Sequence, residues 1–202
     1  MANIVAIGDV HGSYSLLLET LQPLLGTQAE VVFLGDLIDR APEQDGDIKV
    51  LDFVHGLAAA PELAGLSKVT VLTGNHEQLF LQALETGDSE LWEWNGGNPA
   101  LLTEAEKHVD WLKSLPFYYI KGDYLFVHAG VRPDVPLEEQ TLEDCTWIRD
   151  SFLNVEDHGL PYTIVHGHTI VDYPEIHKHR INIDTGAFHT GRLTALNITL
   201  PR

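Results

Sequence analysis

The chain opens on a short apolar run that ends at a glycine. The run, Ile-Val-Ala-Ile at residues 4–7, is followed by Gly8, Asp9 and His11. Apolar residues that continue without alternation are typical of a strand covered on both faces, as in the central sheet of an α/β protein. Ligands collect beyond the carboxyl ends of such strands. If the chain is still extended there, Asp9 and His11 point to the same side and can reach one ion.

An Asp-x-His pair also occurs by chance in loops, so its significance depends on recurrence. Apolar runs at residues 30–34, 68–73, 124–127 and 162–165 are likewise followed by polar side chains. The polar residues after the five predicted strands are Asp9 with His11, Asp36, Asn75 with His76, His128, and His168. Because carboxyl ends lie at one edge of a sheet, we expect these side chains to converge. Six such oxygen and nitrogen ligands suit two divalent ions that share one carboxylate, with positions left for water and substrate.

Segments between these strands predict helices at residues 13–25, 48–60, 78–85 and 104–115. Residues 117–127 predict a hairpin, and residues 181–184 and 192–200 predict closing strands. Residues 132–144 are expected to form a loop. Residues 86–103 are rich in turn formers and contain Trp92 and Trp94, which could line a pocket or pack in the core. The alternation of strands and helices indicates an α/β fold with central mixed sheets flanked by helices.

Length and composition favour one globular domain spanning residues 1–202. The net charge of −18 repels polyanions, so nucleic acid is not an expected partner.

No apolar run approaches the ~18 residues of a membrane span, and no basic leader precedes the first strand, so we expect a cytoplasmic protein without a membrane partner. The single cysteine, Cys145, excludes an intramolecular disulfide and is expected to be a buried apolar residue rather than a nucleophile. The sequence does not define the oligomeric state.

Five short blocks resemble, in order and rough spacing, those of the calcineurin-like metallophosphoesterases. They are Gly8-Asp9-Val10-His11-Gly12, Gly35-Asp36-Leu37-Ile38-Asp39-Arg40, Gly74-Asn75-His76-Glu77, His128-Ala129-Gly130 and Gly167-His168-Thr169. The second and third blocks resemble the phosphoprotein phosphatase branch, especially small bacterial and phage enzymes of the lambda phosphatase type. Diadenosine tetraphosphate hydrolases share the same blocks. The resemblance implies a metallophosphoesterase-type sandwich with its metal site at the carboxyl ends of the strands.

Roles for single residues follow from the resemblance. It implies a first metal held by Asp9 and His11, a bridging Asp36, and a second metal held by Asn75, His128 and His168. It also implies that His76 protonates the leaving oxygen and that Asp39 orients His76. Arg40 and Arg149 would bind phosphate oxygens, a task that suits the planar guanidinium group.

The implied cofactors are two divalent metal ions, with manganese the first expectation and iron or zinc as alternatives. The implied mechanism is direct in-line hydrolysis by a metal-bridging hydroxide, without a phosphoenzyme.

Three functions stay open. The leading one is a phosphatase for phosphoserine and phosphothreonine in proteins or peptides, with phosphotyrosine as a further substrate. The second is hydrolysis of diadenosine tetraphosphate, which needs a base-stacking pocket; the only hints of one are Trp92, Trp94, Tyr118 and Tyr119. The third is a non-catalytic binding module, which the presence of both His76 and Asp39 disfavours.

Two positions depart from the family pattern. Ala41 stands where a glycine usually follows the arginine, so this loop cannot adopt a left-handed conformation cheaply. Ile170 stands where the broader superfamily often has another histidine ligand. His166 is expected to be packed or to lie behind the ligands rather than to bind metal, and His55 to be exposed or partly packed. The histidines expected at the surface or in loops are His108, His158, His177, His179 and His189.

Overall fold

In the computed structural model, which describes residues 3–200, the opening apolar run forms the centre of a four-stranded sheet. β1 (Asn3–Ile7) pairs in parallel with β2 (Glu30–Phe33), and β2 pairs in parallel with β3 (Lys68–Val71). β9 (Ala195–Thr199) runs antiparallel along the other side of β1, which gives the order β3-β2-β1-β9. Residues 4–7 are buried, as expected for a strand that is covered on both faces.

The second sheet contains the predicted hairpin. β4 (Tyr118–Lys121) and β5 (Tyr124–Val127) pair antiparallel. β5, β6 (Thr163–His166) and β8 (Arg180–Asn182) then run parallel, and the short β7 (Glu175–Ile176) closes the edge in the order β4-β5-β6-β8-β7.

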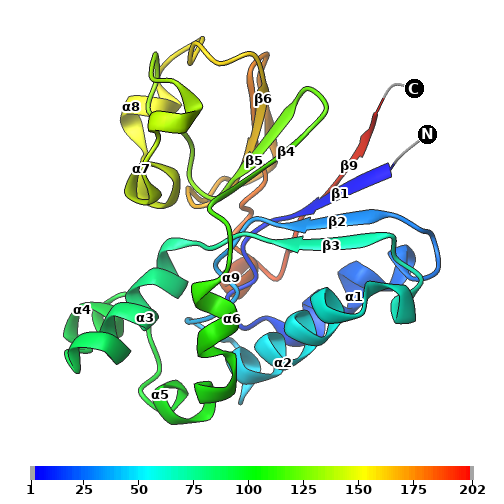
Figure 1. The fold of residues 1–202 in the computed structure, drawn as a ribbon. Helices are drawn as coiled ribbons and strands as arrows, with labels where there is room; N and C mark the ends of the chain where they lie inside the picture. The colour runs from blue at the N-terminus through cyan, green and yellow to red at the C-terminus, as the bar shows by residue number, and fades with distance from the viewer. Residues whose placement is uncertain (1–2, 201–202) are drawn as a thin grey trace.

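The two sheets pack face to face, and helices cover their outer faces (Figure 1). Alternate residues of β1 show the arrangement. Ile4 and Ala6 pack with Phe126 of the second sheet, whereas Val5 and Ile7 pack in the helix-covered cluster. Leu125 and its neighbours on the outer face of the second sheet pack with residues of the following helices. The predicted α/β sandwich of mixed sheets is therefore confirmed.

Helices fill most of the connections. They are α1 (Tyr14–Leu21), α2 (Gly46–Ala59), α3 (Asn75–Thr86), α4 (Glu90–Trp94), α5 (Leu101–Glu104), α6 (Val109–Lys113), α7 (Leu142–Trp147), α8 (Asp150–Leu153) and α9 (Ala187–Thr190). Short 3₁₀ segments within residues 3–200 are η1 (Gln22–Leu24), η2 (Pro61–Ala64), η3 (Glu106–His108) and η4 (Leu137–Glu139). Within residues 3–200 no helix is both long and apolar enough to cross a membrane.

Several predicted helix boundaries were wrong. The first helix ends at Leu21, and the chain continues as a 3₁₀ turn with a proline in its first positions. The expected helix at 104–115 is broken into α5, η3 and α6. The expected loop at 132–144 ends in α7, which is started by a capping box: Thr141 Oγ1 accepts from the Asp144 amide, and the Asp144 carboxylate accepts from the Thr141 amide.

Cys145 is fully buried in the cluster between α7, α8 and the second sheet. Burial, with a contribution from the Asp144 charge, raises the pKa of the Cys145 thiol to about 12. A thiol reacts through its thiolate, so Cys145 is chemically inert in the fold.

We therefore expect an aromatic disulfide reagent at about pH 8 to leave the folded protein unmodified and to titrate one thiol per chain after unfolding in guanidinium. Absorbance of the released thiolate measures both. A reaction of the folded protein as fast as that of free cysteine would contradict the burial of Cys145.

Candidate metal centre and active site

Five strands deliver the predicted ligands to one place. β1, β2 and β3 belong to the first sheet, and β5 and β6 to the second, so the side chains converge from two facing sheets. The expectation that they share the edge of a single sheet was wrong. In residues 3–200, two groups of side chains are close enough to hold an ion: His11 with Asp36 and His76, and Asp36 with His128 and His168. All of these residues are buried.

His128 is the centre of the second group. Its Nδ1 lies 3.0 Å from the Leu34 carbonyl oxygen, to which it donates. Its Nε2 lies 3.0 Å from Asn75 Oδ1, 3.2 Å from His168 Nδ1 and 3.4 Å from Asp36 Oδ2. These three neighbours are acceptors, so either a proton on Nε2 or, once that proton is lost, a metal cation must lie among them. Burial lowers the pKa of His128, but the charge of Asp36 outweighs it and the pKa rises to about 10.

Asp36 links the two groups. Its Oδ2 lies 3.6 Å from His11 Nε2 and 3.4 Å from His128 Nε2, while its Oδ1 accepts from the His76 amide at 3.0 Å. His11 Nδ1 is held at 2.9 Å by the Ile38 carbonyl, and burial lowers the pKa of His11 to about 3. His11 is therefore a neutral imidazole whose Nε2 lone pair is available for a metal.

Asp9 lies beside these two groups, but in the observed side-chain conformations its carboxylate is not close enough to all members of either group to belong to it. Its Oδ2 accepts from the His168 amide at 3.0 Å, and its buried Oδ1 has no hydrogen-bond partner. A Cβ at Gly167 would overlap this oxygen, so only glycine lets the fifth block approach Asp9 so closely. His168 Nε2 is also buried without a partner. Unsatisfied polar atoms at this depth, above all a carboxylate oxygen, are expected where an ion belongs.

The backbone is strained where the ligands sit. Five residues of the site have positive φ angles: His11 (46°), Asp36 (49°), Asp39 (71°), Arg40 (60°) and His168 (64°). Non-glycine residues rarely adopt this conformation, and it concentrates at functional sites. Ala41 is not among them. The left-handed turn therefore lies before Ala41, and the loop does not need a glycine there.

His76 and Asp39 form a closely bonded pair. His76 Nδ1 lies 2.6 Å from Asp39 Oδ2, and both side chains are buried. Burial lowers the pKa of His76, but the charges of Asp36 and Asp39 and the Asp39 hydrogen bond raise it above its ordinary value. Burial raises the pKa of Asp39, and hydrogen bonds from His76 and Trp92 act in the opposite direction. The arrangement leaves His76 Nε2 as the nitrogen that can exchange a proton.

The two predicted phosphate ligands differ in exposure. Arg40 is half-buried; its Nη1 lies 3.2 Å from His11 Nε2, and its guanidinium lies 5.4 Å from the centre of the Phe188 ring. Arg149 is exposed, and its Nη1 donates to Thr169 Oγ1 at 3.0 Å, next to His168. One arginine therefore flanks each metal-ligating group.

The sequence profile described as calcineurin-like phosphoesterase matches residues 2–191. The chain belongs to this family. It is 29% identical to serine/threonine-protein phosphatase 2 of Salmonella typhimurium, over 97% of this chain and 93% of the relative. It is also 29% identical to the asymmetrical bis(5'-nucleosyl)-tetraphosphatase PrpE of Bacillus velezensis, over 93% of this chain and 86% of the relative. A solved structure of a candidate diadenosine tetraphosphatase has the same fold, with a TM-score of 0.70 at 20% identity over 97% of this chain and 89% of that one.

Calcineurin-like phosphoesterases use dinuclear divalent metal centres. Two ligand groups that share the Asp36 carboxylate, with the unpartnered Asp9 Oδ1 beside them, fit such a centre. The first group differs from the expected set, because His76 stands in it where Asp9 was predicted.

Two residues of the site had no predicted role. The buried Glu77 carboxylate accepts from the amides of Gly74, Asp36 and Leu37 at 2.7, 2.9 and 2.8 Å. It thereby ties the second block to the third and starts α3 at Asn75 rather than at residue 78. Asp184 is also buried, and after the burial of Asp9 itself its charge is the main cause that raises the pKa of Asp9. Asp184 follows β8 as Asp9 follows β1, which was the available sequence signal.

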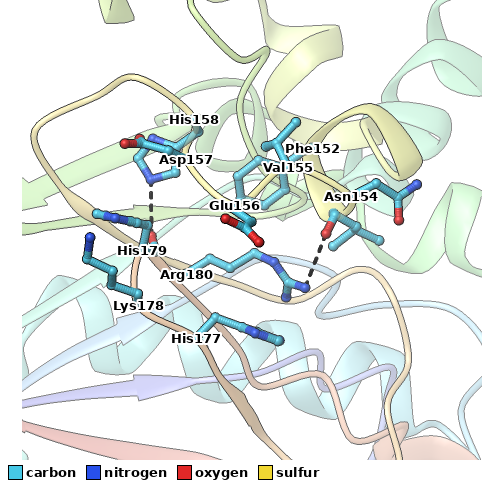
Figure 2. Close-up of a pocket in the computed structure, with 11 residues that line it drawn as sticks. Phe152, Asn154, Val155, Glu156, Asp157, His158, His177, Lys178, His179 and Arg180 are labelled. Atoms are coloured by element: carbon cyan, nitrogen blue, oxygen red, sulfur yellow. Dashed lines mark hydrogen bonds between the residues drawn. The ribbon is translucent and has the colours of Figure 1, made fainter.

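Histidines outside the site are partly buried, contrary to expectation. His108 and His158 are buried rather than exposed. His158 Nε2 donates to the His179 carbonyl at 3.1 Å in a hollow of about 510 Å³ that His177 also lines (Figure 2). His166 is packed edge-on against Phe152, as expected for a residue that is not a ligand. None of these histidines joins a group of three ligand atoms in the described part of the chain.

We expect chelator-stripped protein to bind two Mn²⁺ ions per chain in a calorimetric titration and His128→Ala to bind one. The variant loses the imidazole whose Nε2 faces the other acceptors of the second group. His177→Ala, an exposed histidine of neither group, is the matched control and should still bind two. Binding of two ions with unchanged affinity by His128→Ala would contradict the assignment.

Proposed function

We propose that the chain is a phosphatase for phosphoserine and phosphothreonine in proteins or peptides. The observation that carries the proposal is the His76–Asp39 pair beside two ligand groups that share Asp36, with an arginine on each flank. A binding module has no need for a proton donor held at 2.6 Å by a buried carboxylate. The same residues would act on phosphotyrosine, whose ester differs only in its leaving group.

In the proposed mechanism Arg40 and Arg149 hold phosphate oxygens and orient the phosphoryl group. Their guanidinium donors suit charge that spreads over the equatorial oxygens in the transition state. Asp9, His11, Asp36, Asn75, His128 and His168 would hold two divalent ions. When bound, these ions supply Lewis acidity that activates water and stabilises phosphoryl oxygens. Manganese is our first choice, and iron or zinc suit the same mixed ligands.

His76 would move the proton. Its Nδ1 is committed to Asp39, so its Nε2 donates to the oxygen of the leaving alcohol. The charges of Asp36 and Asp39 and the Asp39 hydrogen bond raise the pKa of His76 against the effect of burial, which favours the protonated form that donates. Serine and threonine are poor leaving groups as alkoxides, so they depend on this proton transfer.

The aromatic residues support the phosphoprotein substrate. Trp92 is buried and bonded to Asp39, and Tyr119 donates to Glu30, at the start of β2 and away from Asp36 at its far end. Tyr118 packs edge-on against Phe117. Of the four residues that hinted at a base-stacking pocket, only Trp94 is exposed, at 84%. Three of the four are therefore engaged in packing or hydrogen bonds, and only Trp94, next to the Asn95 whose carbonyl accepts from Arg40, is free to stack on a base.

Hydrolysis of dinucleoside polyphosphates is the second candidate. Trp147 is 38% exposed and lies edge-on to His168, with 6.1 Å between ring centres, two residues before Arg149. An exposed indole beside a phosphate-binding arginine could stack on a base. The name of the Bacillus velezensis relative supports the same possibility.

We expect metal-stripped protein to release phosphate from a phosphothreonine peptide and from p-nitrophenyl phosphate only after Mn²⁺ is added. His76→Asn should lower kcat on the peptide by about 10²- to 10⁴-fold while metal still binds. Chromatography of diadenosine tetraphosphate digests runs in parallel. A higher kcat/KM for the dinucleotide than for the peptide would select the second candidate, and no hydrolysis of any substrate by the metal-loaded protein would overturn both.

A further inference from the structure

The segment that follows α3 holds the two residues at the end of the second block. Trp92, on α4, donates its indole N–H to both carboxylate oxygens of Asp39, at 3.0 and 2.8 Å. The Asn95 carbonyl accepts from Arg40 Nε at 3.1 Å, and the Gly96 carbonyl accepts from the Arg40 amide at 3.1 Å. One short segment therefore holds two consecutive residues that both have left-handed backbones.

Such backbone conformations persist only where the surroundings hold them in place. Asp39 and Arg40 have φ angles of 71° and 60°. The contacts from residues 92–97 reach the side chain of Asp39 and both the side chain and the backbone of Arg40. This segment therefore stabilises the strained turn that carries these two residues.

Trp92 is suited to hold Asp39 in one orientation. Its side chain is 1% exposed, its ring centre lies 5.4 Å from that of Phe80, and a Cβ at Gly97 would overlap the indole. An indole N–H only donates, so it cannot compete with Asp39 for the His76 proton. His76 Nδ1 bonds to Asp39 Oδ2, and the Trp92 N–H bonds to Oδ2 and Oδ1 of the same carboxylate. The orientation in which Trp92 holds the carboxylate therefore sets the direction of His76 Nε2.

We propose that residues 92–97 form a positioning clamp for Asp39 and Arg40, in which Trp92 acts through Asp39 to aim the proton-donating nitrogen of His76. The inference rests on the proposed role of His76. It gives a function to Trp92 and to the Asn-Gly-Gly turn that the family resemblance left without one. Trp92 is a positioning residue, because it touches Asp39 rather than the reacting atoms.

Trp92→Phe tests the clamp, because phenylalanine keeps an aromatic ring in the core and removes the N–H. The p-nitrophenolate anion is a good leaving group and needs no proton from the enzyme. The leaving group of phenyl phosphate is more basic, so its departure is faster when a proton is donated to its oxygen. We expect kcat/KM for phenyl phosphate to fall about 10- to 100-fold, the size associated with a hydrogen bond to a charged group. The value for p-nitrophenyl phosphate should fall less than about threefold, and inhibition by inorganic phosphate should be unchanged.

Gly97→Ala is a second, independent variant. Its methyl group would push the indole away from Asp39, so it should give the same dependence on the leaving group. Trp111→Phe is the matched control, because it makes the same exchange of side chains at a tryptophan that does not contact Asp39. Trp111 lies on α6, and its ring centre is 4.4 Å from that of His55, on which it stacks. This control should change kcat/KM for neither phosphate ester by more than about threefold.

A double-mutant cycle with Asp39→Asn shows whether Trp92 acts through Asp39. If it does, Trp92→Phe adds little to the loss already caused by Asp39→Asn. The proposal would be overturned if Trp92→Phe lowered kcat/KM equally for both phosphate esters. It would also be overturned if the decreases caused by Trp92→Phe and Asp39→Asn were additive, because Trp92 would then only support the fold. Failure of the proposed function is a different result, since the unaltered protein would then hydrolyse neither ester.

Discussion

The site depends on one buried carboxylate between two imidazoles. Asp36 Oδ2 lies within 3.6 Å of His11 Nε2 and within 3.4 Å of His128 Nε2, which come from different sheets. Burial raises the pKa of Asp36, but the charges of His128 and His76 hold it well below its usual value. A buried charge of this kind must be paired or must bind metal. The two sheets are therefore joined at the point where their negative charge needs a cation.

The surrounding backbone is organised to keep Asp36 in place. Glu77 accepts amides from the second and third blocks, and Asp36 itself accepts the amide of His76. The Asp36–Glu77 and His76–Asp36 bonds join the second block to the third, so the positions of the ligands are set before any ion arrives. The positive φ angle of Asp36 is stabilised by these contacts, which is how a strained site persists in a stable fold.

Charge distribution distinguishes the site from the rest of the surface. The chain carries a net charge of −18, yet Arg40 and Arg149 flank the ligand groups. An acidic protein that binds a phosphate ester needs local positive charge to overcome the repulsion of its surface. In the proposed function, two ions and the two arginines would supply it at short range, where screening by salt has little effect.

The sequence alone determined the elements that carry the chemistry. Uninterrupted apolar runs followed by glycine and polar residues located β1, β2 and β3 correctly, because burial on both faces demands that composition. The recurrence of carboxylate, amide and imidazole side chains after five predicted strands indicated a metal site, because these are the ligands that suit divalent ions. The start of α7 also had a readable capping signal at Thr141 and Asp144, which the prediction of a loop overlooked.

Only the tertiary structure decided which of these residues meet. Ligands expected at one sheet edge come from two facing sheets, and His76 rather than Asp9 joins the first group as the side chains stand. The bond from Trp92 to Asp39 joins residues 53 positions apart, and no local pattern encodes such a contact. The burial of His108 and His158 was hidden for the same reason. Composition and periodicity report what a segment buries, whereas the partner that it meets depends on how the whole chain packs.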